Sequence, residues 1–175
     1  MHVTHPDKVR WFKPIGTNVL DTYGSSAQKQ LRASLEKCAA AAITHTITPL
    51  TQADIDWFTP FYEANLASKD NAVIHDVYAS TLGKHPEDTY FILKTTEQNE
   101  PRGAVIFAKR ADRIATVYRV FERNWQRSKL RANPALLSEY FLDTYAAGCG
   151  YSMLSHGRDR NPYGPNAAIG LATFK

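Results

Sequence analysis

The residues best suited to proton transfer lie in a polar segment near the end of the chain, from His156 to Pro165. The segment follows a predicted strand, and ligands of α/β folds commonly bind at the carboxyl ends of strands. His156 is a candidate general base because histidine has an ordinary pKa close to neutrality. Arg158, Arg160 and Asn161 are candidates for binding a substrate. The alternative is a plain turn, shaped by the glycines and prolines of the segment.

A second candidate is the basic stretch that precedes a predicted helix. Asn133 is a good helix cap, and Pro134 favours the first helical position. The N-terminus of a helix attracts phosphate through its free N–H groups and its dipole, and nearby cations add to that attraction. A site for the phosphates of a nucleotide or of coenzyme A is therefore expected, with a solvated basic loop as the alternative. Its candidate residues are Arg127, Ser128, Lys129, Arg131 and Asn133.

Three further residues are candidates on position alone. Glu122 lies at the end of a predicted strand and is a possible carboxylate base, although a surface glutamate is the simpler reading. His75 and Tyr78 lie one turn apart on a predicted helix and are candidates for lining a substrate cleft. An ordinary helix face is the alternative for that pair.

Composition places the chain among folded, mildly basic proteins. It has 175 residues, 43% hydrophobic and 22% charged, with a formal net charge of +4. One domain with a substantial core is expected, and anionic cofactors or nucleic acid are compatible partners. Two cysteines without metal-ligand spacing argue against a zinc site and a disulfide scaffold. No signal sequence and no spanning apolar stretch is found, so a cytoplasmic protein without membrane or metal is expected.

The apolar pattern predicts an α/β chain with an irregular beginning. Residues 1–24 lack a period and are expected to form an irregular arm. The predicted helices are 27–42, capped by Ser25 or Ser26; 52–67, with a kink or break at Pro60; 72–82; and 134–148. The predicted strands are 44–49, 89–95, 103–109, 114–121 and 149–155. An antiparallel meander and then a βαβ-like crossover in a mixed sheet follow from the connection lengths.

This element order is similar to that of the GNAT acyltransferase superfamily. The stretch 136–174 resembles the Fem-type and related GNAT-like domains in particular. The matching pairs are Ala147-Gly148, Gly157-Arg158, Gly170-Leu171 and Phe174-Lys175. The resemblance implies an N-terminal arm and helix over 1–43 and a GNAT-like domain over 44–175 that lacks its last strands. A sheet edge left open in this way invites pairing with a partner domain or with a second copy of the chain.

The resemblance also implies a reaction. An acyl or aminoacyl group would pass from acetyl-CoA, another acyl-CoA or an aminoacyl-tRNA to an amine on a small molecule or peptide. Tyr163 would be the general acid for a thiolate leaving group, beside His156 and Glu122 as candidate bases. Arg127, Lys129 and Arg131 would hold the phosphates of the donor.

One departure from the family leaves other functions open. GNAT acetyltransferases carry a glycine-containing Arg/Gln-x-x-Gly-x-Gly/Ala motif before this helix, whereas 127–133 contains no glycine. The competing hypothesis is a non-catalytic half-domain completed by a second domain or partner subunit. An RNA-binding domain is a third hypothesis, and it requires the aromatic and basic residues to share one face.

Overall fold

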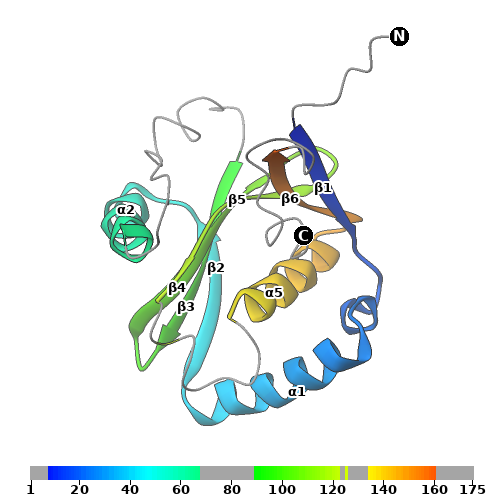
Figure 1. The fold of residues 1–175 in the computed structure, drawn as a ribbon, viewed down its shortest axis with the longest axis horizontal. Coiled ribbons are helices and arrows are strands. Elements are labelled where there is room, and N and C mark those ends of the chain that lie inside the picture. Colours follow the sequence, from blue (N-terminus) through cyan, green and yellow to red (C-terminus); the bar gives the residue numbers. More distant parts are fainter. Residues whose placement is uncertain (1–7, 68–88, 123–124, 126–133, 161–175) are drawn as a thin grey trace.

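A computed structural model describes residues 8–67, 89–122, 125 and 134–160, with the backbone alone at 8–11, 66 and 156–160. Six strands form one mixed sheet in the order β1-β6-β5-β4-β3-β2 (Figure 1). The strands are β1 Lys8–Pro14, β2 Ile43–Pro49, β3 Thr89–Glu97, β4 Glu100–Lys109, β5 Ile114–Phe121 and β6 Met153–Arg160. The helices are α1 Ser25–Ala40, α2 Gln52–Ala67 and α5 Pro134–Gly148, with a 3-10 turn η1 at Val19–Thr22.

The centre of the sheet is the predicted antiparallel meander. β2, β3, β4 and β5 pair in sequence over seven or more residue positions at each ladder. Their β-branched and aromatic residues suit a pleated surface that is buried on both faces. The prediction of these four strands is confirmed, with ends shifted by no more than three residues.

Alternate residues of the meander belong to two separate hydrophobic cores. Leu93 and Phe107 face α1 and α5, whereas Ile92 and Ile106 face α2. This division follows from the two-residue period of a strand. Figure 1 shows α2 on one side of the sheet and α1 and α5 on the other. None of the helices in the described ranges is long and apolar enough to cross a membrane.

The start of α2 is fixed by a capping box. The Asp54 backbone N–H donates to Thr51 Oγ1 at 3.3 Å, and the Thr51 N–H donates to Asp54 Oδ2 at 2.9 Å. The helix then continues through Pro60, so the predicted break into two helices is wrong. For α1 the predicted serine cap is also wrong. Its cap is Gly24, which makes no side-chain hydrogen bond.

The beginning of the chain is more ordered than its sequence predicts. The irregular arm expected over residues 1–24 is wrong for Lys8–Pro14, which forms β1. This strand pairs antiparallel with β6, from Lys8 opposite Arg160 to Pro14 opposite Met153. The side of β6 that was expected to be an open sheet edge is therefore covered by β1. The predicted helix 72–82 lies outside the described residues.

Candidate functional site

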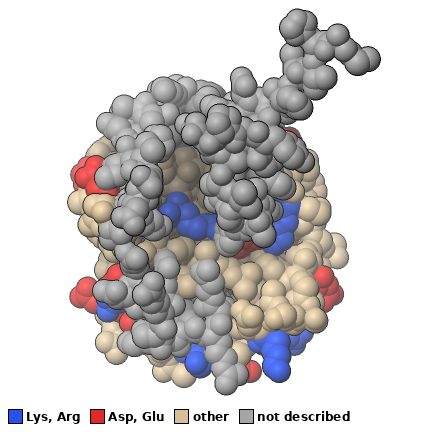
Figure 2. Space-filling model, in the orientation of Figure 1, with Lys and Arg blue, Asp and Glu red and all other residues tan. Residues whose placement is uncertain are grey.

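The parallel strands β5 and β6 share only a short ladder. Ile114 pairs with Leu154 and Ala115 with Ser155. Beyond this point β5 stays with β4, and β6 continues alongside β1. The two strands diverge in Figure 1, and Figure 2 shows Lys and Arg side chains near the centre of the same view. The crossover predicted from the sequence is confirmed, and it opens between its two strands.

A β-bulge in β5 lies close to this opening. Thr116 is opposite Phe107 and Tyr118 is opposite Ile106, so Val117 has no partner on β4. A bulge bends its strand and changes the direction of the following side chains, and bulges are common beside active sites. Here the bulge returns Arg119 to the face that α5 covers, opposite Val105 of the core beneath that helix.

Helix α5 connects β5 to β6 and brings its N-terminus toward the open side. A crossover helix runs opposite to the strands it joins, so Pro134 lies toward the carboxyl end of β5 (Figure 1). The first backbone N–H groups at such an end have no partner within the helix, although Pro134 itself carries no N–H. The positive end of the helix dipole is at the same place, which favours a negatively charged ligand.

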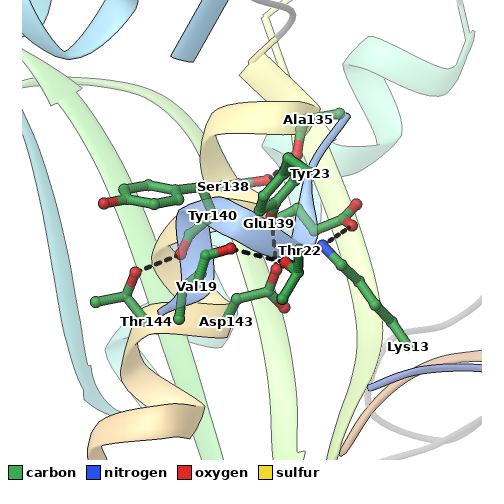
Figure 3. A network of polar contacts seen from close by, with 10 residues as sticks. All are labelled: Lys13, Val19, Thr22, Tyr23, Ala135, Ser138, Glu139, Tyr140, Asp143 and Thr144. Carbon is green, nitrogen blue, oxygen red and sulfur yellow. Dashed lines mark hydrogen bonds and ion pairs between the residues drawn. The ribbon is translucent and has the colours of Figure 1, made fainter. Parts of the chain in front are cut away.

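A network of charged side chains ties α5 to the beginning of the chain (Figure 3). Lys13 Nζ of β1 contacts Glu139 Oε1 at 2.9 Å and Asp143 Oδ2 at 2.6 Å. The Tyr23 hydroxyl donates to the same Asp143 oxygen at 2.5 Å, and Lys13 Nζ lies 3.7 Å from the centre of the Tyr23 ring. The side chain of Asp143 is only 2% exposed. Since Lys13 is opposite Leu154, the network lies beside the first of the two rows that join β6 to β5.

Burial sets the protonation behaviour of this network. Burial raises the pKa of Asp143 above the ordinary carboxyl value, although Lys13 and Tyr23 oppose the shift. Burial, together with the Asp143 carboxylate, raises the pKa of the Tyr23 hydroxyl well above its ordinary value. Burial also lowers the pKa of Arg119, and the negative charges of Glu139 and Asp143 oppose this shift. Arg119 thus belongs electrostatically to the network on α5.

The carboxyl end of β5 carries a second polar cluster, which includes the predicted Glu122. Arg102 Nη1 donates to Glu122 Oε2 at 2.9 Å, and Arg102 Nε lies 3.4 Å from Glu97 Oε2. The indole N–H of Trp125 donates to the same Glu97 oxygen at 3.2 Å, and both of these side chains are buried. The cluster fixes the chain on both sides of residues 123–124, immediately before the basic segment.

Next to this cluster β4 and β5 approach each other closely. A Cβ atom at Gly103 would lie 2.1 Å from the ring of Phe121, so only glycine leaves room for that ring. Phe121 is buried in the core beneath α5. The end of β5 is therefore held by packing as well as by ion pairs.

The predicted site residues are only partly within the described residues. Glu122 is described in full. His156, Arg158 and Arg160 are placed by their backbone, in strand β6. The polar loop predicted from His156 is therefore wrong up to Arg160, because pairing with β1 extends the strand. The candidates outside the described residues are His75, Tyr78, Arg127, Ser128, Lys129, Arg131, Asn133, Asn161 and Tyr163.

Sequence reasoning missed the residues of the network itself. Glu139 and Asp143 are four residues apart in a helix that is otherwise mainly apolar, and Arg119 interrupts an apolar strand. Such isolated charges on buried faces were the available signal. No such signal exists in the sequence for Lys13, because its partners on α5 are more than 120 residues away.

A histidine on the same face of the sheet has a different environment. The ring of His45 in β2 stacks on Phe141 of α5, with 4.1 Å between the ring centres. Burial lowers the pKa of His45 from 6.5 to about 4, so this imidazole is neutral at neutral pH. It is part of the packing between α5 and the sheet edge.

A separate groove of about 490 Å³ lies between the N-terminal segment and α5. Its lining carries no charged side chain and includes no residue of β5 or β6. The lining residues are Thr17, Asn18, Val19, Leu20, Tyr140, Thr144, Ala147 and Gly148. The groove is therefore distinct from the opening between the two parallel strands.

The meander, the crossover and the diverging parallel strands define a GNAT-like α/β domain, as the sequence predicts. Solved structures of the same fold support this assignment. FemX superposes with a TM-score of 0.70 at 10% identity, over 98% of this chain and 58% of FemX. L-PGS from Bacillus licheniformis superposes with a TM-score of 0.56 at 12% identity, over 95% of this chain and 52% of that one.

A third similar structure is the C-terminal domain of a putative lysylphosphatidylglycerol synthetase from Agrobacterium fabrum. Its TM-score is 0.51 at 8% identity, with 95% of this chain and 51% of that one covered. This chain therefore spans only between half and three fifths of the length of these structures. No family model and no curated protein matches the sequence.

Proposed function

We propose that the chain is an acyltransferase domain that moves an acyl or aminoacyl group to an amine. The observation that carries this proposal is the crossover β5–α5–β6, in which parallel strands part while the connecting helix points its N-terminus toward the open side. In this proposal the opening between the two strands is the slot for an extended donor, and the helix N-terminus at its mouth is the anion site. The similarity to FemX in fold is in agreement with it.

The donor in this proposal is an acyl-CoA, such as acetyl-CoA, or an aminoacyl-tRNA. Both carry phosphates that suit the helix N-terminus and the cations preceding it. We assign the donor phosphates to Arg127, Lys129 and Arg131, supported by Ser128 and Asn133. The cluster of Glu97, Arg102, Glu122 and Trp125 would hold the start of that segment in place.

The acceptor amine would approach from the other side of the slot, past the end of β6. His156 is the proposed base and Tyr163 the proposed acid. His75, Tyr78, Arg158, Arg160 and Asn161 are proposed to contact the acceptor. Catalysis would consist mainly of holding amine and donor together and removing a proton. Glu122 stays a candidate base, although its ion pair with Arg102 favours an anchoring role.

A thermal-shift panel with acetyl-CoA, longer acyl-CoAs and tRNA tests the donor. A ligand at about 100 times its Kd stabilises the folded state by about 2.7 kcal/mol, which raises the melting temperature measurably. The triple variant R127Q/K129Q/R131Q is expected to abolish the shift. The matched control K29Q/R32Q/K37Q removes three exposed cations from α1 and should leave it unchanged. No shift with any donor contradicts the proposal.

One observation favours a second candidate function, a non-catalytic half-domain. The chain covers between 51% and 58% of the similar structures, so those proteins contain a further part that this sequence does not match. A direct assay for transfer of labelled acetyl from acetyl-CoA to a mixture of amines separates the two. Donor binding without any transfer would favour the half-domain.

A further inference from the structure

Four buried polar atoms near the opening lack a hydrogen-bond partner among the described residues. They are Asp143 Oδ1, Arg119 Nε, Arg119 Nη2 and Thr116 Oγ1. Each unsatisfied buried group costs about 1–3 kcal/mol, and folded proteins rarely leave several of them together. Bound water or a ligand is the usual reason for such a group of atoms.

These atoms belong to one face of the sheet. Thr116 and Arg119 of β5 are opposite Phe107 and Val105, and both of those residues lie in the core beneath α5. Asp143 projects from α5 toward the same face, and its charge acts on the Arg119 guanidinium. The atoms therefore border the point at which β5 and β6 part.

The free oxygen of Asp143 is held ready by its neighbours. Lys13 and Tyr23 both bind Oδ2, which fixes the carboxylate and leaves Oδ1 without a partner. A carboxylate oriented through one oxygen is preorganised to accept a donor at the other. On the opposite side, Arg119 offers the two unpartnered donors Nε and Nη2, and a guanidinium can bind a carboxylate through two parallel hydrogen bonds.

The net charge of these side chains limits the charge that a ligand of the site can carry. Among the described residues, Lys13 and Arg119 carry two positive charges and Glu139 and Asp143 carry two negative charges, so these four sum to zero. A ligand with net charge would leave one buried charge without compensation, which is costly. A ligand with one ammonium and one carboxylate keeps the balance and satisfies both sides.

We propose that Arg119 and Asp143 form a binding site for the zwitterionic head of an α-amino acid. Arg119 binds the carboxylate, Asp143 Oδ1 accepts from the ammonium, and the Thr116 hydroxyl contacts the carboxylate. The acceptor of the acyl group is then a free amino acid, whose ammonium loses a proton to the proposed base before the amine attacks the donor. This identification of the acceptor rests on the proposed function, whereas the binding site itself does not.

Calorimetric titration of the purified chain with free amino acids tests the site. The panel contains each amino acid, its N-acetyl form, which lacks the ammonium, and its amide, which lacks the carboxylate. Loss of one charged hydrogen-bonding group is expected to weaken binding roughly 10- to 100-fold. Only the free amino acids should therefore bind, with a Kd of about 1 mM or lower.

Two variants locate the binding. Arg119→Gln and Asp143→Asn each keep the approximate shape of the side chain and remove its charge, and each should weaken binding at least about tenfold. The controls are Arg32→Gln and Asp112→Asn, which remove exposed charges elsewhere and should change nothing. If Asp143→Asn does not fold, as judged by circular dichroism, Arg119→Lys and Thr116→Val take its place with the same expectation.

The contrary results are equally definite. This site is overturned if no amino acid binds the folded chain, or if Arg119→Gln binds amino acids as tightly as the wild type does. Bound water would then be the partner of the four buried atoms. Unchanged shifts with acyl-CoA or tRNA in that case would leave the proposed function intact. Amino acid binding without any donor binding would keep this site and contradict the transferase.

Discussion

The two halves of the sheet are held together by different means. From β2 to β5 the ladders are long, and apolar side chains fill both faces. Between β5 and β6 the parallel ladder has two residue pairs, and β1, which pairs with β6, is tied to α5 by ion pairs. A continuous sheet gives stability through packing, whereas an opening for a ligand leaves polar groups to hold the strands in place.

The largest effect is expected in the apolar half. Phe107→Ala removes a fully buried ring that packs against Phe91 and Tyr145. The cavity should lower the free energy of unfolding by about 3–5 kcal/mol. Urea unfolding followed by circular dichroism measures it. The exposed Thr48→Ala on β2 is the control, and a loss at Phe107 no larger than at Thr48 would contradict the description of this core.

In the polar half, Lys13→Met keeps the length of the side chain but removes the cation shared by Glu139 and Asp143. Two carboxylates are then left partly buried without it, and a loss of about 2–3 kcal/mol is expected. Hydrogen exchange should also become faster at β1 than in β3 and β4. The exposed Lys37→Met serves as the control. Equal protection of β1 in wild type and variant would show that the ion pairs do not hold this strand.

Tyr23→Phe sharpens the comparison further, since it removes one hydroxyl and nothing else. Its hydrogen bond to Asp143 is buried and charge-assisted, so a loss of about 1–2 kcal/mol is expected. Urea unfolding in the Lys13→Met background measures the coupling between the two contacts. Strictly additive losses would mean that Lys13 and Tyr23 act on Asp143 independently.

The smallest effect is a pH dependence at the edge of the apolar half. The folded pKa of His45 is about 4, below its ordinary value of 6.5, so the unfolded chain takes up a proton first as the pH falls. Stability from this residue is complete above pH 6.5 and decreases toward pH 4, by less than about 1 kcal/mol between pH 7 and pH 6. His45→Phe keeps the stack on Phe141 and should remove this part of the pH dependence. An unchanged pH profile in the variant would place the titration elsewhere.

The parts of the fold that the sequence predicted well are those set by local pattern. Strands of the meander alternate β-branched residues between short turns, and α5 begins at Pro134 and ends at Gly148. Strand β1 was missed because its pairing partner follows it by about 140 residues. The end of β6 was missed because Gly157 and the charged residues around it have low strand propensity, which pairing with β1 overrides.

The candidate site was less predictable than the fold. Glu122 was found from its place at a strand end, but its ion pair with Arg102 depends on the register of β4 and β5. Asp143 and Arg119 come together only through the crossover and the bulge at Val117. No spacing in the sequence encodes that meeting. The division at residue 43 and the roles given to the basic segment stay predictions.

The neighbouring positions of β1 and β6 have a consequence for synthesis of the chain. The ribosome makes β1 first and its only sheet partner among the described strands last, about 140 residues later. At about 5–20 residues per second, β1 waits roughly 7–30 s while the meander is already complete. Until α5 has been made, Lys13 lacks its partners Glu139 and Asp143. Closure of the sheet by the earliest strand is therefore a late event in folding.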